Sequence, residues 1–149
     1  MATPDMSLYH LLQKTHVLLD DGDQRILAPY DLSSQQYHLL LHLSQGGDGP
    51  GLTKRDLADR LICDPSNITR QVERLEGRGL VLTLDDRDDK RKQRLHLTTA
   101  GREVFAAAQR AHHASVERRF GALSEAEHQT LMALIARLGA QLERELQPA

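Results

Sequence analysis

What most constrains the fold of this chain is the segment LTKRDLADRLICDPSNITRQVERLEGRGLV, which predicts two short helices joined by a tight turn. Thr53 and Asp56 have the spacing of a capping box at the start of the first helix. Asp64 is expected to cap the second helix, and Pro65 occupies its first turn, where a missing N–H costs nothing. The residues expected to face inward are Leu57, Ala58 and Leu61 on the first helix and Ile68, Val72 and Leu75 on the second.

Two short strands are expected next, Leu80–Thr83 and Arg94–Leu97, and a highly charged block joins them. Nine of the ten residues from Asp85 to Arg94 are charged, four acidic and five basic. Strands this short do not form a stable ribbon alone, so the block must project from helices packed beneath it. The sequence therefore predicts a charged hairpin tip beside the helix pair.

Two helices are expected before this segment and two long helices after it, from the spacing of their apolar residues. The order of elements predicts a mainly α fold with a small β-hairpin wing, a winged helix-turn-helix within a helical frame. A length of 149 residues is typical of a single domain. The expected helix starts are Ser7, Ser33, Thr98 and Ser124, with capping-box partners Gln36 for Ser33 and Glu127 for Ser124.

The composition is that of an ordinary globular protein, with 40% hydrophobic and 27% charged residues. The N-terminus MATPDMSLYH lacks the basic start and apolar run of a secretory signal. No later stretch approaches the roughly 20 apolar residues of a membrane span. The single cysteine, Cys63, cannot form an internal disulfide. We therefore expect a cytoplasmic protein with no membrane association.

The charged residues are distributed unevenly along the chain, and this distribution is more informative than the net charge. A formal net charge of -2 argues weakly against nucleic-acid binding, because such domains usually carry a basic excess. Residues 51–102, however, carry twelve basic and nine acidic side chains, a local charge of +3, whereas residues 1–50 carry two and six. The helix-turn-helix and hairpin are thus the basic part of the chain.

The second short helix offers side chains suited to duplex DNA. A helix-turn-helix places this helix in the major groove, where its N-terminal residues meet base edges and phosphate. Arginine can bond guanine with two hydrogen bonds, and small hydroxyls or an amide can contact bases or phosphate. The alternative is that these residues form only the solvated face of an amphipathic helix. The candidate DNA contacts are Ser66, Asn67, Thr69, Arg70 and Arg74.

The hairpin tip adds cations beside that helix. The adjacent minor groove has a negative potential that attracts arginine where the groove is narrow. Arg91, steadied by Asp89 two residues earlier, is the first candidate for this groove. Arg87, Lys90 and Lys92 are expected near phosphates. The alternative is a solvated loop whose mixed charges only aid solubility.

Three fragments together resemble the winged-helix core of the multiple-antibiotic-resistance regulator (MarR) family: LTKRDLADRL, SNITRQVERLEGRGLV and DKR...LHLTTAG. Each fragment alone is a weak signal, but the ordered set at this spacing is specific. The order of helices extends the likeness over nearly the whole chain. The resemblance implies a single domain over 1–149, with a DNA-binding lobe at 52–98 and dimerisation helices at 1–45 and 99–149.

The resemblance also implies how such a protein works. Members of the family are mostly homodimeric repressors. They release a pseudo-palindromic operator, an inverted repeat in double-stranded DNA, when a small molecule or oxidant acts on them. The recognition helix would run from about Pro65 to Gly77 and the wing from Leu80 to Leu97. Asp89 and Arg91 match an aspartate and an arginine that are typical of the family's wing.

Two departures from the family's pattern concern the wing. Arg87 occupies a wing position at which members of the family commonly have proline. Asp85, Asp86 and Asp88 add negative charge where the wing approaches phosphates, which opposes its insertion.

The resemblance places an effector site between the first two helices and the fifth, for a small aromatic or phenolic molecule. Imidazoles at i and i+4, such as His38 and His42, can share a zinc ion, so metal sensing is an alternative. Redox sensing through Cys63, beside the positive end of the second short helix, is another. Exposed or interfacial histidines are the plainer interpretation. The candidate ligand-binding residues are His16, Tyr37, His38 and His42.

Two other classes of function follow from the residues alone. A winged helix can dock another protein, with the basic wing serving an acidic partner. An enzyme is disfavoured, because we find no phosphate-binding glycine loop, no nucleophile with an ordered base nearby and no metal-ligand set beyond scattered histidines. We therefore expect no catalytic residue, no cofactor and no bound metal.

Overall fold

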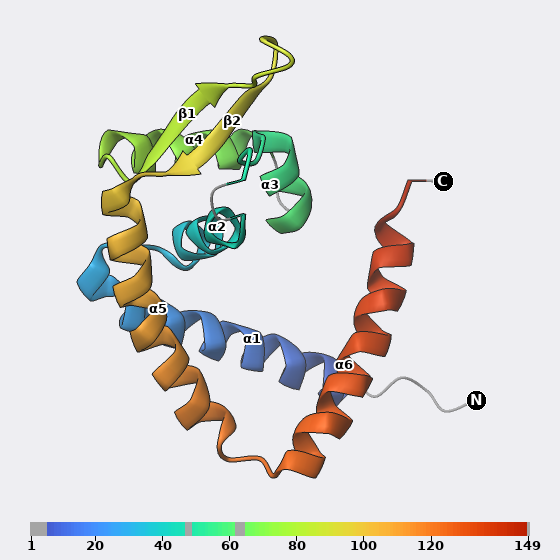
Figure 1. Ribbon diagram of the computed structural model, residues 1–149. Coiled ribbons are helices and arrows are strands. Elements are labelled where there is room, and N and C mark those ends of the chain that lie inside the picture. The colour runs from blue at the N-terminus through green and yellow to red at the C-terminus, as the bar shows by residue number, and fades with distance from the viewer. Residues whose placement is uncertain (1–5, 47–48, 62–64, 149) are drawn as a thin grey trace. The chain divides into compact units, whose positions relative to one another are not determined.

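A computed structural model describes residues 6–46, 49–61 and 65–148 of the chain (Figure 1). It contains two compact units, residues 1–113 and residues 114–149. The end of α5 and all of α6 (Glu125–Leu146) belong to the second unit. The first unit contains α1 (Met6–Leu27), a short 3-10 helix (Ala28–Tyr30), α2 (Ser34–Gln45), α3 (Lys54–Leu61), α4 (Pro65–Gly77), β1 (Val81–Asp85), β2 (Gln93–Leu97) and most of α5 (Thr99–Phe120).

Capping boxes fix the starts of three helices, as their sequence spacing predicted. In each box the hydroxyl of the first residue accepts a hydrogen bond from a backbone N–H three residues later, whose side chain accepts one in return. These bonds satisfy backbone donors that have no partner inside the helix. The pairs are Ser33 with Gln36 for α2, Thr53 with Asp56 for α3, and Ser124 with Glu127 for α6.

The core of the first unit lies beneath α4 and the hairpin. Helix α2 packs against α1, α3, α4 and β2, so it is the centre of this unit. The Gln36 side chain also donates a 3.0 Å hydrogen bond to Gln71 of α4, which ties the two helices together. The inward residues predicted for α4 are all buried. The buried apolar residues are Leu27, Leu32, Tyr37, Leu39, Leu40, Leu43, Leu57, Ala58, Ile68, Val72, Leu75, Leu80, Val81, Leu95, Leu97, Phe105 and Ala108.

Strands β1 and β2 form an antiparallel hairpin whose tip projects beyond the helices (Figure 1). The register pairs Val81 with Leu97 at the base and Asp85 with Gln93 near the tip. Leu52, in the segment before α3, adds a bridge to Leu95 of β2, with N···O distances of 3.3 and 2.7 Å. The wing is therefore attached on one side to the chain that enters α3.

Several predicted boundaries were wrong, and among them the first strand ends at Asp85 and not at Thr83, while the second begins at Gln93 and not at Arg94. Ser7 lies inside α1, which already includes Met6, so it does not precede the helix as a cap. Leu80 was predicted to open the first strand, but the strand runs from Val81 to Asp85. The reason is that Leu80 N–H donates to Leu75 at 3.0 Å and its carbonyl accepts from Thr98 at 3.1 Å, so it pairs with a helix end and a turn.

Candidate nucleic-acid interface

Helix α4 separates a buried face from a polar one. Ile68, Val72 and Leu75 are buried, which leaves the residues between them on the outer side. The predicted recognition residues lie there: Ser66, Arg70 and Arg74 are exposed, and Asn67 and Thr69 are partly exposed. The expected cap Asp64 and the redox candidate Cys63 lie outside the described residues.

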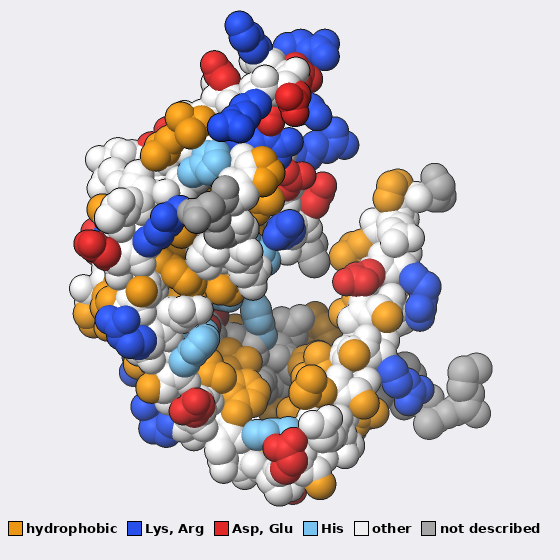
Figure 2. Space-filling model, in the orientation of Figure 1, with side chains coloured by type: hydrophobic (Ala, Val, Ile, Leu, Met, Phe, Trp, Pro, Cys, Tyr) orange, Lys and Arg blue, Asp and Glu red, His pale blue; other side chains and the backbone are white. Residues whose placement is uncertain are grey.

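The hairpin tip holds Arg91 in a fixed position, as its spacing to Asp89 predicted. The Asp89 carboxylate accepts from the Arg91 backbone N–H at 3.0 Å and from its guanidinium Nε at 3.1 Å. These hydrogen bonds also keep the pKa of Asp89 below its usual value. Arg87, Lys90 and Arg91 are all exposed, and Figure 2 shows basic side chains gathered at the tip with acidic ones among them. The tip therefore presents an arginine hydrogen-bonded to Asp89 among other exposed cations.

Asp86, which the sequence analysis counted as negative charge facing phosphate, is paired with a cation of the same hairpin. Its Oδ1 accepts from Arg94 Nε at 2.6 Å, and its Oδ2 accepts from the backbone N–H groups of Asp88 and Asp89. Arg94 also donates to the Gly51 carbonyl oxygen at 3.1 Å. The side chain of Asp86 is only 14% exposed, and its hydrogen bond from Arg94 holds its pKa below the usual range. We call the set of Asp86, Arg94 and Gly51 the wing latch.

Sequence reasoning missed the wing latch because it selected cations for their outward position. Its signal was nevertheless present, since Asp86 and Arg94 lie near opposite ends of a charged block that the hairpin folds together. Asp85 and Asp88 remain exposed, as expected.

Two of the four candidate ligand residues, Tyr37 and His38, form a cluster with His112 of α5 and Asp23 of α1. The Tyr37 ring lies 4.7 Å from the His112 ring and 5.5 Å from the His38 ring, and His112 Nε2 lies 3.3 Å from Asp23 Oδ1. His42 also lies on α2, and burial lowers the pKa of the His42 imidazole.

His16 does not join this cluster. It is exposed on α1 and shares no hydrogen bond, ion pair or ring contact with the cluster in the described chain. Asp23 and His112 were not among the predicted ligand residues, because their pairing joins two distant helices. Within the described residues, no three His, Cys, Asp or Glu side chains are grouped to hold a metal ion.

Comparison with known proteins agrees with this geometry. A sequence profile described as "MarR family" matches residues 32–92. The transcriptional regulator HosA of Escherichia coli is 30% identical over 108 residues, which cover 72% of this chain and 78% of HosA. The chain belongs to the MarR family. MarR family proteins are DNA-binding transcriptional regulators and not enzymes, and this chain is one of them.

Several solved structures share the fold. The Staphylococcus aureus MepR–DNA complex has a TM-score of 0.82 at 22% identity, covering 90% of this chain and 95% of that one. CouR of Rhodococcus jostii RHA1, bound to p-coumaroyl-CoA, has a TM-score of 0.77 at 23% identity, covering 99% and 98%. No described helix is long and apolar enough to cross a membrane.

For this MarR family wing, Asp86→Asn is expected to weaken binding to duplex DNA by about three- to tenfold at low salt. The substitution removes a negative charge, so simple electrostatics predicts tighter binding. The wing latch predicts the opposite, because an amide cannot accept from Arg94 while it also holds the tip backbone. Fluorescence anisotropy with a labelled duplex measures the change.

Asp85→Asn is the matched control for this prediction. Asp85 is exposed, and its carboxylate has no hydrogen bond or ion pair in the described chain. Replacing Asp85 should tighten binding to duplex DNA by about twofold at low salt, since the only interaction lost is repulsion between its carboxylate and the phosphates. Tighter binding by both variants would show that the latch does not position the wing.

Proposed function

We propose that the chain is a homodimeric repressor that binds an inverted repeat in double-stranded DNA and releases it when a small aromatic or phenolic effector binds. One observation carries this proposal: a single lobe presents the polar face of α4 beside a hairpin whose tip arginine is held in place. A helix and an adjacent cationic finger suit the major groove and the next minor groove.

Each candidate residue has a role in this proposal. Arg70 reads a base edge, and the smaller residues of the first turns of α4 contact bases or phosphate. Arg91 enters the minor groove, with Asp89 holding its guanidinium. The remaining contacts, all to the DNA backbone, are Arg74, Arg87 and Lys90.

The homodimer is supported by apolar surface that each unit leaves uncovered within itself. Helix α6 has no buried residue, yet a stripe of hydrophobic side chains follows its length, and Figure 2 shows hydrophobic side chains along it. Helix α1 also exposes apolar side chains, including Leu8, Leu11 and Leu18. Large exposed apolar surfaces usually mark interaction sites, and a second copy is the commonest partner. The stripe on α6 consists of Leu131, Leu134, Ile135, Leu138 and Leu142.

The effector proposal draws on the cluster around Tyr37. In the described chain, the Nδ1 atoms of His42 and His112 are buried and have no hydrogen-bond partner. Buried polar atoms of this kind normally have partners, so the cluster suits a ligand with an aromatic ring and a polar group. The p-coumaroyl-CoA bound by CouR is a ligand of that chemistry on the same fold. An operator affinity unchanged by p-coumarate and p-coumaroyl-CoA would count against this ligand class.

Arg70→Ala and Arg91→Ala test the DNA-binding assignment. With duplexes from the region upstream of the coding sequence, Arg70→Ala should relax base preference by about 1–3 kcal/mol at one position. Arg91→Ala should weaken binding to all sequences by a similar factor. Anisotropy titrations against a set of single-base variants of the bound duplex separate the two effects.

These titrations also discriminate between functions. A wild-type protein that ignores duplex DNA in dilute buffer would favour docking to a protein partner. Normal binding by both variants would remove Arg70 and Arg91 from the interface.

A further inference from the structure

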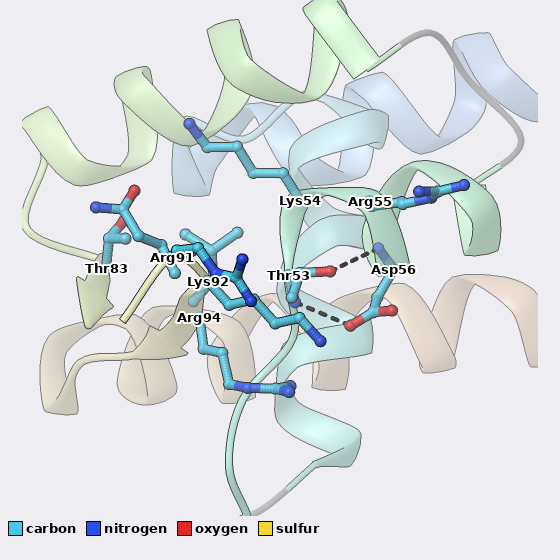
Figure 3. Close-up of a pocket in the computed structure, with 10 residues that line it drawn as sticks. Thr53, Lys54, Arg55, Asp56, Thr83, Arg91, Lys92 and Arg94 are labelled. Atoms are coloured by element: carbon cyan, nitrogen blue, oxygen red, sulfur yellow. Dashed lines mark hydrogen bonds between the residues drawn. The ribbon is translucent and has the colours of Figure 1, made fainter. Parts of the chain in front are cut away.

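Arg78, the residue that follows α4, uses its charge within the protein. Other basic side chains of the lobe, among them Lys54 and Lys92, line an open cavity of about 500 Å³ between α3 and the hairpin (Figure 3). Arg78 does not line this cavity. Its Nη1 donates to the Asp31 carbonyl oxygen, and its Nη2 donates to the Tyr30 carbonyl oxygen at 3.2 Å. We call these two hydrogen bonds the Arg78 clamp.

The two carbonyl groups belong to the turn that ends the first helix. The 3-10 helix Ala28–Tyr30 continues α1 directly, and Asp31 closes it in the left-handed conformation, which aspartate adopts more readily than most residues. The last carbonyl groups of a helix have no partner inside it, and the planar fork of an arginine can donate to two of them at once. The Asp31 carboxylate is 3.8 Å from Arg78 and its side chain is 92% exposed, so the carbonyl groups are the main partners.

Arg78 moves with α4. Its backbone N–H donates to the Arg74 carbonyl oxygen at 3.3 Å, which continues the hydrogen bonding of the helix. Nearer the middle of α4, the Gln71 side chain accepts from Gln36 of α2. Side-chain hydrogen bonds therefore fasten α4 at two points, to α2 near its middle and to the turn after α1 at its C-terminal end. Two such points fix the direction of a helix axis.

The residues proposed to read bases lie toward the other end of α4. Ser66 precedes Gln71 by five residues, which is roughly 7 Å along a helix axis. If the C-terminal end were released, α4 could pivot near Gln71, and its first turn would move. Such a tilt would carry Ser66 and the long side chain of Arg70 away from the base edges.

Helix α1 also contributes to the cluster proposed for the effector. Asp23 Oδ1 lies 3.3 Å from His112 Nε2 of α5. Tyr30 follows Asp23 by seven residues, about two helical turns. A shift of α1 at this cluster would therefore reach the carbonyl groups that Arg78 holds.

We propose that Arg78 is a positioning residue, which sets the tilt of α4 from the place of α1 and makes base recognition depend on the contact between α1 and α5. The proposal rests on the proposed reading of bases by α4. It adds a route by which the effector cluster can influence DNA binding. The route requires no contact between Arg78 and DNA.

Arg78→Met tests the clamp, because it keeps the length of the side chain and removes the donors. Anisotropy titrations compare a random-sequence duplex with the upstream duplex that the wild type binds best. Affinity for the random duplex should stay within about twofold, since contacts to phosphate dominate it. The preference for the upstream duplex should fall about tenfold, the size of one weakened base contact. Arg78→Lys should restore part of the preference, because an ammonium group can still donate to a carbonyl oxygen.

Arg25→Met is the matched control. Arg25 lies in the last turns of α1, and its ion pair with Asp21, at 3.0 Å, stays within that helix. The same chemical change is thus made near the same turn without loss of a bond to α4, and both affinities should equal those of the wild type. The midpoint of urea unfolding shows whether Arg78→Met is folded, because partial unfolding would lower both affinities by the same factor.

Asp23→Ala tests whether α1 is the other end of the route. It removes the carboxylate beside His112 and should lower the preference of the wild type for the upstream duplex by about three- to tenfold. In the Arg78→Met background the same change should have no further effect, because the clamp is already lost. The wild type, the two single variants and the double variant form a double-mutant cycle in which the effects are not additive.

Three results would overturn the proposal. The first is Arg78→Met with an unchanged preference for the upstream duplex. The second is an equal loss of affinity for both duplexes, which a merely structural role predicts. The third is Asp23→Ala that has no effect on the wild type, or the same effect in both backgrounds. Wild-type protein that binds no duplex, or all duplexes equally, is a different result, since it defeats the proposed reading of bases itself.

Discussion

Gly101→Ala is expected to destabilise the protein by about 3 kcal/mol, although alanine is the better helix former. Gly101 is buried in the first turn of α5, where its N–H donates to the Thr98 hydroxyl at 2.9 Å. A Cβ atom there would overlap the Leu80 carbonyl oxygen and lie 2.9 Å from the carbonyl carbon. That oxygen also accepts from Thr98 N–H, so it cannot move without loss of a hydrogen bond. Urea unfolding monitored by circular dichroism measures the change.

Gly77→Ala is the control for this substitution. Gly77 ends α4, and nothing lies within 4 Å of the position that its Cβ would take. Alanine should stabilise the protein there by up to about 1 kcal/mol, through helix propensity alone. A Gly101→Ala variant as stable as Gly77→Ala would show that the contact between α5 and Leu80 is loose.

Leu134→Glu combined with Leu138→Glu is expected to raise the dissociation constant of the proposed homodimer by at least about a hundredfold, because each leucine buried in that interface would contribute roughly 1.5–3 kcal/mol. Both residues are exposed in the single chain, so the substitutions should not unfold it. Operator affinity should fall together with dimerisation, because two linked binding sites are converted to separate ones. Sedimentation equilibrium and anisotropy titration measure the two effects.

Ala140→Glu places the same charge on the opposite side of α6, where helical spacing puts it away from the leucine stripe. It should leave the dimer intact. A doubly substituted protein that still sediments as a dimer would move the interface away from this stripe.

The helix starts could be predicted because their signals are local. A capping box needs only two residues three positions apart, so the pairing of Ser33 with Gln36 could be predicted without knowledge of the fold. The contact between Arg91 and Asp89 could be predicted for the same reason, because the two residues are close in sequence. The buried face of α4 followed from helical spacing alone.

The contacts that could not be predicted join distant parts of the chain. Arg94 reaches the Gly51 carbonyl, 43 residues earlier, through the register of a hairpin and its bridge to Leu52. His112 pairs with Asp23 through the packing of helices that the sequence leaves unspecified. Helical periodicity predicted the apolar stripe of α6, but it could not show that the unit containing α6 buries none of that stripe.

The bridge between Leu52 and Leu95 has a mechanical consequence. Two short strands alone make a weak ribbon, and a third pairing stiffens it. Here the third partner is Leu52, just before α3, so backbone hydrogen bonds join the wing to the segment that enters α3. A displacement of the start of α3 is therefore expected to tilt the finger as well.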